Sequence, residues 1–270
     1  LLFLFLLTIG YSSCDFLDIV PDEITTEADA FKDRNAAKNF VYSCYGYLPQ
    51  SNVASGSLDL LTGDEVITAF EHETFASFPK GNYTASSPVI SYWNTFFQGL
   101  RQCYIFLENV DKVPDLTESV KTDYIAQVKF LIAYYHYQLA RCYGPIILIK
   151  ELPDVNASQA EYLPRTSYDE CVDWICNLLD EAASSLPAIR TNKEDYGLAT
   201  SVGAKAVKAK MLLYAASPLF NGNSSFYSNF TDKSGSQLMP LTYDPNKWVK
   251  TSTAIKEAID LAEQNGHALY

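Results

Sequence analysis

The pattern of hydrophobic positions is strongest between Tyr124 and Leu148, where it predicts a central helix. Apolar side chains recur there at steps of three and four residues, which places them on one helical face. Further aromatic and aliphatic side chains cover most of the remaining circumference, so other helices must pack on several sides. Gly144-Pro145 ends the helix, because glycine suits a left-handed cap and proline cannot continue a helix. The predicted face comprises Ile125, Val128, Ile132, Tyr135, Leu139 and Cys142.

Two helices are predicted before the central one. Residues 34–48 show an apolar face of the same period, which Asp33 can cap and Pro49 ends. Residues 91–112 show a second apolar face of this kind. Trp93 is expected in the core because it is in register with the rest of that face. This face comprises Trp93, Phe97, Leu100, Tyr104 and Leu107.

The next helix opens with a capping box formed by Ser167 and Glu170 and is ended by Pro187. Its apolar face steps by three and four residues throughout. An alanine-rich helix follows within residues 201–220, and its small side chains permit close approach of neighbouring helices. A segment rich in Gly, Asn and Ser, residues 221–237, then interrupts the helical pattern.

The last predicted helix starts with Asp244 at the N-cap and Pro245 at the first helical position. It ends at Asn265-Gly266, where glycine again suits the cap. The face expected to be buried comprises Trp248, Ser252, Ile255, Ile259 and Ala262. The sequence therefore predicts an all-α fold, a tetratricopeptide-like array of helical hairpins with some pairs about 30 residues apart and with long irregular loop insertions.

Composition and charge narrow the function. The 270 residues are 48% hydrophobic, which is typical of a globular chain. A net charge of -12 without any basic run argues against nucleic-acid binding. The five cysteines after Cys14 are an odd number on predicted helices, so they form no disulfide framework. Because the histidines have no ligand-like partners and no CxxC occurs, we expect neither a metal site nor a cofactor.

The N-terminal sequence LLFLFLLTIGYSSC resembles a signal peptide followed by a bacterial lipobox. Its apolar run, Leu1 to Ile9, is far shorter than the roughly 20 residues that a membrane span needs. Small residues directly before Cys14 suggest cleavage after residue 13 and lipidation of the Cys14 thiol and amine, although Tyr11 stands where leucine is usual. The alternative is an ordinary signal peptide with Cys14 as a bystander. Since no initiator Met is present, and the chain ends just beyond a helix cap, we expect a fragment truncated at both ends.

Several short motifs, in order and spacing over most of the chain, make the sequence similar to the SusD/RagB family. These are surface lipoproteins that bind nutrient glycans for a partner transporter. The sequence departs from the family pattern at Ile132, where arginine is usual, and at Pro145, where proline usually comes later. The matching residues are Cys14-Asp15-Phe16-Leu17-Asp18, Pro21, Gly63-Asp64-Glu65, Trp93, Ile105, Asn109, 129–144, Pro164-Arg165, Tyr168-Asp169-Glu170, Leu186-Pro187 and 204–220.

The resemblance implies a glycan-binding lipoprotein rather than an enzyme. Residues 14–270 would be the N-terminal region of a longer SusD-like protein, lacking its C-terminal half. It would be lipid-anchored in the outer membrane, exposed at the cell surface, and would deliver oligosaccharides to a TonB-dependent transporter of SusC type. In that picture the helices 34–48, 91–112 and 118–142 support the transporter contact, and the irregular residues 50–88 supply the sugar contacts.

Residues 50–88 contain the side chains that such a site requires. Pyranose rings stack on flat apolar faces, and their hydroxyls need polar partners. The candidate glycan-binding residues are Phe70, Glu71, His72, Phe75, Phe78, Asn82 and Tyr83. The alternative is that these rings anchor the loop onto the helices. His136 lies among packed tyrosines and is expected to be an interior, hydrogen-bonded residue.

Two other functions are also compatible with the sequence. The chain could be a lipid-anchored helical-repeat module that binds only protein. It could also be a glycoside hydrolase, with Asp64-Glu65 or Glu71 and Glu73 as its carboxylate pair. Adjacent positions in sequence say nothing about the separation that such a pair needs, and Gly63-Asp64-Glu65 is more simply explained as ordering the loop. The chain contains no GxSxG, Walker, HExxH or GxGxxG motif.

Overall fold

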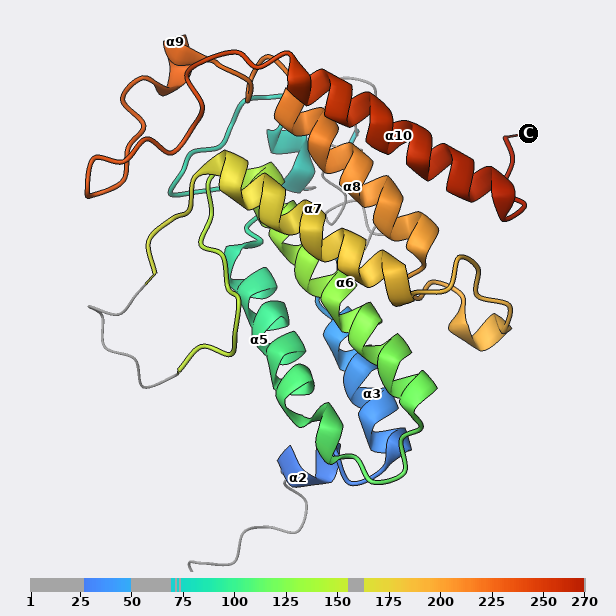
Figure 1. Cartoon of the computed structure of the whole chain (residues 1–270). Helices are drawn as coiled ribbons and strands as arrows, with labels where there is room; N and C mark the ends of the chain where they lie inside the picture. Colours follow the sequence, from blue (N-terminus) through green and yellow to red (C-terminus); the bar gives the residue numbers. More distant parts are fainter. Residues whose placement is uncertain (1–26, 50–68, 71, 73, 155–162, 270) are drawn as a thin grey trace, which may run out of the picture.

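The protein folds into a row of antiparallel α-helices (Figure 1). The structure is a computed structural model that describes residues 27–49, 69–70, 72, 74–154 and 163–269. No strand occurs among these residues, where Thr84 with Ser87 and Thr231 with Gln237 form isolated β-bridges. The helices are α2 (Glu27–Ala30), α3 (Arg34–Tyr45), α5 (Trp93–Asn109), α6 (Glu118–Tyr143), α7 (Tyr168–Ser185), α8 (Ser201–Ala216), α9 (Ser224–Tyr227) and α10 (Asn246–Gln264). Short 3₁₀ turns are η2 (Thr74–Ser77), η3 (Val110–Lys112) and η5 (Lys193–Asp195).

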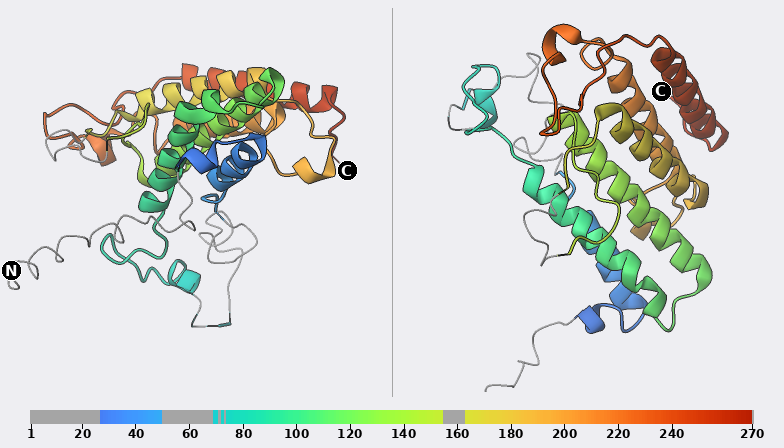
Figure 2. Two further views of the ribbon diagram at one scale, coloured as in Figure 1. Left: turned by 90° about the horizontal axis from the view of Figure 1, so that it is seen from below. Right: turned by 60° about the vertical axis from the view of Figure 1, so that its left-hand side comes forward.

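Successive long helices lie side by side. Helix α5 packs on α6, α6 on α7, α7 on α8 and α8 on α10, and each runs opposite to the one before it (Figures 1 and 2). Helix α3 contacts both α5 and α6 at the other end of the row. This arrangement confirms the predicted all-α hairpin array. Within the described part of the chain, no helix is both long and apolar enough to span a bilayer.

Helix α6 is the central helix that the hydrophobic pattern predicts. Val128, Ile132 and Leu139 are fully buried, and Gly144 closes the helix at a positive φ of 71°. The predicted face fails only at its ends: Ile125 is half-buried and Cys142 is exposed. Neighbouring helices cover the middle of α6 on several sides, whereas only part of its circumference is covered near the termini.

Helix α5 is rotated relative to its predicted orientation. Leu100 and Tyr104 of the predicted face are buried, but Trp93 is only half-buried, and Phe96, Cys103 and Phe106 complete the buried face instead. Gly99 explains why this face of α5 packs inward, because an added Cβ there would lie 3.0 Å from both the Tyr135 ring and the Tyr47 Cβ. The close approach of α5 to α6 at Gly99 turns the neighbouring Phe96 side inward. Trp93 packs against the core only from its edge, so the expectation that it belongs to the core is confirmed in part.

Helix α10 buries its small side chains rather than its large ones. Thr251 and Ala254 face α8, whereas Trp248, Ile255 and Ile259 are exposed. The predicted buried face is therefore wrong, and the reason lies in α8. That helix presents alanine to its neighbours, so small residues on α10 let the two helices approach closely.

The helix starts are confirmed in part. Asp33 caps α3, accepting from the backbone N–H groups of Asn35 and Ala36 at 2.9 Å. Ser167 occupies the N-cap of α7, but its side chain makes no capping hydrogen bond, so the predicted capping box is absent. Pro245, rather than Asp244, is the N-cap of α10, although the Asp244 carboxylate still accepts from the N–H of Asn246 at 2.9 Å.

Candidate functional site

Three long connections leave the array at one end. Because successive helices are antiparallel, the segments before α5, between α6 and α7, and between α8 and α10 emerge together (Figure 1). We call this region the loop-bearing end. Its described residues are 69–70, 72, 74–92, 144–154, 163–167 and 217–245. Connections 110–117 and 186–200 lie at the opposite end.

Hydrogen bonds join these segments at their bases. The Tyr92 N–H donates to the Tyr143 hydroxyl at 3.0 Å, which links the start of α5 to the end of α6. The Thr166 N–H donates to the Ile146 carbonyl at 2.7 Å. The Tyr168 N–H donates to the carbonyl of Leu238 at 2.8 Å, which brings in the α8–α10 connection. The loop-bearing end is therefore built on a common, hydrogen-bonded base.

A groove of about 740 Å³ lies in this base, between α5 and the α6–α7 connection. Trp93 and Phe97 form its aromatic wall, and Ile147 and Leu152 are among its aliphatic residues. The Arg165 guanidinium lies 5.4 Å from the centre of the Trp93 ring. The edge-on contact of Tyr143 with Trp93, at 5.2 Å between ring centres, fixes that ring further. Trp93 thus has a positioned, half-buried ring at the edge of a cavity.

His136 braces the opposite wall of the groove from inside the array. Its Nδ1 lies 2.8 Å from the Ile132 carbonyl, and its Nε2 accepts from the Ile149 N–H at 3.1 Å. Because the carbonyl oxygen can only accept a hydrogen bond and the backbone N–H can only donate one, the ring carries its proton on Nδ1. Complete burial lowers the pKa of His136 to about 4, so the ring is neutral. The expectation of an interior, hydrogen-bonded histidine is confirmed.

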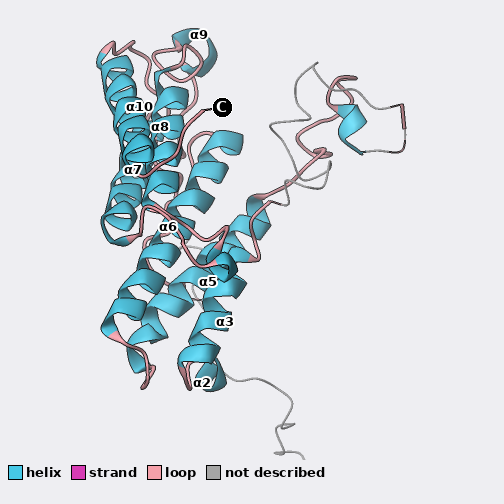
Figure 3. Ribbon diagram, turned by 90° about the vertical axis from the view of Figure 1, so that its right-hand side faces the viewer, coloured by secondary structure: helices cyan, strands magenta, loops and turns pink. Residues whose placement is uncertain are grey.

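The predicted sugar-contacting residues form two ring pairs where the structure describes them. The Phe70 and His72 ring centres are 5.8 Å apart, and those of Phe78 and Tyr83 are 5.5 Å apart. Phe70 is 65% exposed and Tyr83 is 51% exposed, so neither ring is buried as an anchor. Asn82 is also exposed. Figures 2 and 3 show that the segment around η2 stands away from the helical array.

The other predicted side chains lie outside the part of the chain that the structure describes. Cys14 and Glu71 lie outside the described residues, as does the side chain of Phe75. The acidic candidates for a hydrolase, Asp64, Glu65 and Glu73, also lie outside them. In the described part of the chain, no group of three or more His, Cys, Asp or Glu side chains is arranged to hold a metal ion.

The structure adds a second aromatic surface that sequence reasoning missed. Phe226 is 74% exposed. The centre of its ring lies 6.3 Å from that of Tyr227, and the centre of the Phe230 ring lies 6.1 Å from that of Tyr227. Gln237 donates to the carbonyls of Tyr227 and Phe230 and so holds this part of the connection. The sequence signal was available, because aromatic residues in a segment rich in Gly, Asn and Ser are the same signal that singled out residues 70–83.

The backbone that presents this surface is closely fixed. Asn221 is buried and exchanges two hydrogen bonds of 2.9 Å with the backbone of Asp244, closing the base of the connection. At Gly222, with φ of 78°, an added Cβ would meet the backbone of Tyr243 at 2.2 Å, so no other residue fits. At the tip, hydrogen bonds from Ser234 and Ser236 hold the pKa of Asp232 below its usual range.

Comparison with known proteins assigns the chain to a family. The family model described as "Starch-binding associating with outer membrane" matches residues 15–213. SusD-like protein P25 of Formosa agariphila is 22% identical over 224 residues, which are 78% of this chain and 42% of that protein. The solved structure of BT4246 is 36% identical with a TM-score of 0.78, covering 87% of this chain and 41% of that one. A laminarin binding SusD-like protein has the same fold, with 23% identity and a TM-score of 0.58 over 69% of this chain and 41% of that one.

The chain thus spans about two fifths of the length of these relatives. The family match extends from the segment before α2 into α8 and covers more than half of the chain. The protein belongs to the SusD-like family.

Proposed function

We propose that this protein binds an oligosaccharide at its loop-bearing end and holds it without cleaving it. The observation that carries the proposal is the exposure of aromatic rings on two connections of a chain whose family is starch-binding. Phe70 and Tyr83 lie on one connection and Phe226 on the other. In this role the ring faces stack on the C–H surfaces of pyranose rings, and nearby amides such as Asn82 bind the hydroxyls.

Family membership also supports a place in glycan uptake at the outer membrane. We propose that a lipid on Cys14 anchors the protein at the cell surface and that it serves a TonB-dependent transporter of SusC type. The hydrophobic N-terminal run before Cys14 and the association of the family with the outer membrane support this step. Labelling of cells with a radioactive fatty acid tests the anchor: the native protein should take up label and Cys14→Ser should not. Co-purification of the porin from detergent-solubilised membranes tests the partner.

Glycan binding is tested with neutral polysaccharides. Electrophoresis in gels that contain starch or laminarin should retard the native protein. The double variant Tyr83→Ala/Phe226→Ala should bind more weakly by about 30-fold, because two stacking contacts together contribute roughly 2 kcal/mol. Tyr196→Ala is the matched control, since this 64% exposed ring lies in the connection at the opposite end. Absence of retardation by every neutral polysaccharide tried would refute the proposal.

The same material decides between binding and hydrolysis. Oligosaccharides incubated with the protein should remain intact. Release of reducing ends that is lost in Glu71→Gln would instead establish a glycoside hydrolase. Failure to bind any sugar, together with stable co-purification of a protein partner, would favour the protein-interaction module.

A further inference from the structure

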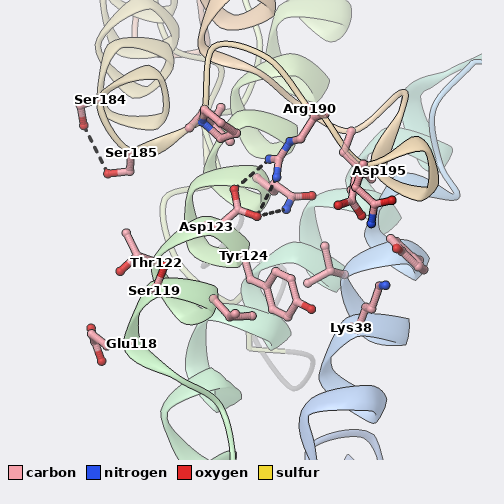
Figure 4. A pocket seen from close by; sticks show the side chains of 18 residues that line it. Lys38, Glu118, Ser119, Thr122, Asp123, Tyr124, Ser184, Ser185, Arg190 and Asp195 are labelled. Atoms are coloured by element: carbon pink, nitrogen blue, oxygen red, sulfur yellow. Dashed lines mark hydrogen bonds and ion pairs between the residues drawn. The ribbon is translucent and has the colours of Figure 1, made fainter.

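A polar pocket of about 750 Å³ lies at the end of the array opposite the loop-bearing end. Helix α3, the start of α6, the end of α7 and the α7–α8 connection enclose it (Figure 4). Its volume falls within the range of roughly 300–1,000 Å³ that is usual for small-ligand sites. Asp123 in this pocket and Tyr143 at the other end are both on α6, and 20 residues of helix separate them by about 30 Å. The pocket is therefore distinct from the groove beside Trp93.

The floor of the pocket is a fixed network. The Arg190 guanidinium donates to both oxygens of Asp123, at 2.8 and 2.9 Å, and also to the Ala199 carbonyl. Gln127 donates to Asp123 at 2.8 Å and accepts from the Tyr45 hydroxyl at 3.0 Å. Opposite charges are paired and each polar group has a partner, so the floor carries no net charge and is organised in advance of any ligand.

The mouth of the pocket combines aromatic rings with polar groups of both signs. Tyr42 and Tyr124 contribute rings that are partly accessible, and the Lys38 ammonium lies 5.5 Å from the centre of the Tyr42 ring. Asp195 approaches from the α7–α8 connection. Figure 4 shows Lys38, Tyr124 and Asp195 around the same opening.

This lining selects a class of ligand. A phosphate or sulfate group would meet Asp195 and Glu118 as well as Lys38, and an organic cation would meet Lys38. A neutral, hydroxyl-rich ligand faces neither repulsion, and hydroxyl groups also line the pocket at Ser119, Thr122, Ser184 and Ser185. We propose that the pocket is a second carbohydrate subsite, which takes a neutral segment of a glycan. This inference rests on the proposed function, because it assigns a second contact to the same kind of ligand.

The pocket and the loop-bearing end lie at opposite ends of the array, which α6 spans over about 30 Å, so binding should depend on the length of the glycan chain. A polysaccharide that reaches both gains the second contact at high effective concentration, and its affinity rises without a new type of contact. A trisaccharide is shorter than this separation and occupies each subsite independently.

The experiment is calorimetric titration of the whole chain with maltotriose and laminaritriose, and in parallel with starch and laminarin. Lys38→Ala/Asp195→Ala alters the mouth but leaves the Arg190–Asp123 floor in place. Tyr196→Ala is the control, because Tyr196 neighbours Asp195 but does not line the pocket. The native chain should bind two equivalents of the preferred trisaccharide. The pocket variant should bind one, and its affinity for the matching polysaccharide should fall at least tenfold.

The outcomes separate the two proposals. If the native chain binds no sugar, the proposed function fails and the second subsite fails with it. If the native chain binds a single equivalent, or if the pocket variant keeps both equivalents, the second subsite is refuted while glycan binding at the loop-bearing end stands. The variant Tyr83→Ala/Phe226→Ala should retain the equivalent that belongs to the pocket. Circular dichroism of each variant shows whether its fold is intact.

Discussion

His136 shows how a single side chain couples the interior of the array to pH. The ring is neutral in the fold because burial removes it from water, and its pKa is about 4 against 6.5 in an unfolded chain. Between these values the unfolded chain binds a proton and the folded chain does not. Stability contributed by the neutral ring is therefore present above pH 6.5 and is lost as the pH falls towards 4.

The first prediction follows from this difference. The free energy of unfolding of the native protein should fall by about 2 kcal/mol between pH 7.5 and pH 5 through His136 alone. The variant His136→Gln should be less stable at pH 7.5, because glutamine does not reproduce the two hydrogen bonds of the His136 ring. Its free energy of unfolding should, however, change less between pH 7.5 and pH 5. Urea unfolding at a series of pH values measures both. Equal slopes for the two proteins would show that His136 does not titrate in this way.

The Arg190–Asp123 pair is the second residue-level feature with a measurable role. Both side chains are largely shielded from solvent, at 11% and 26% exposure. Asp123→Ala leaves the guanidinium with the Ala199 carbonyl alone, so we expect a loss of about 3 kcal/mol. The control is Lys256→Ala, which breaks an exposed ion pair with Asp260 on α10. Its free energy of unfolding in urea should lie within about 0.5 kcal/mol of that of the native protein. A similar loss in both variants would contradict the assignment.

Among the elements, α10 contacts the array through small residues, and this determines which substitutions matter. Ala254 is buried against α8, whereas Ile259 is 50% exposed. Ala254→Leu should cost about 1–3 kcal/mol, because a larger side chain cannot fit between the two helices. Ile259→Lys should change stability by less than about 0.5 kcal/mol. Thermal unfolding compares the two, and a greater loss for Ile259→Lys would mean that the large apolar face is the one that packs.

The crossing of α5 and α6 depends on Gly99 in the same way. Gly99→Ala should destabilise the protein by about 1–3 kcal/mol, since the new methyl group would press on Tyr135 and Tyr47. Gly203→Ala, in the first turn of α8, is the control, because the nearest atom there is the Thr200 hydroxyl oxygen at 3.3 Å. Its expected effect is neutral or slightly stabilising, through better helix propensity. Chemical denaturation that ranks the two variants in the opposite order would remove the close crossing as an explanation.

Under the proposed function, the net charge of this chain limits the glycans that suit it. A net charge of -12 repels polyanions at long range, and salt screens that repulsion. The affinity for neutral starch or laminarin should therefore change by less than about twofold between about 50 and 500 mM salt, because binding neutralises no net charge. Sulfated or uronic polysaccharides should bind weakly at low salt. Affinity measured across this salt range tests the prediction, and tight, salt-sensitive binding of a polyanion would contradict it.

The order and number of the long helices could be predicted from the amino-acid pattern, because a helical period and its capping residues are local properties. Asp33, Gly144 and the run through α6 show this most clearly. The choice of inward face on α5 and α10 could not be predicted in the same way. Both helices carry apolar residues on more than one side, so the face that packs depends on which neighbour approaches closely.

The sequence also predicted that irregular connections with exposed aromatic residues would carry the function, and it pointed to one of the two that the structure presents. Only the tertiary arrangement places residues 217–245 beside the start of α7, through the hydrogen bond from the Tyr168 N–H to the Leu238 carbonyl. Only that arrangement creates the pocket over Arg190 and Asp123, whose residues are 67 positions apart. Local patterns determine helices because neighbouring residues form them. A binding surface assembles from distant residues, so packing decides it.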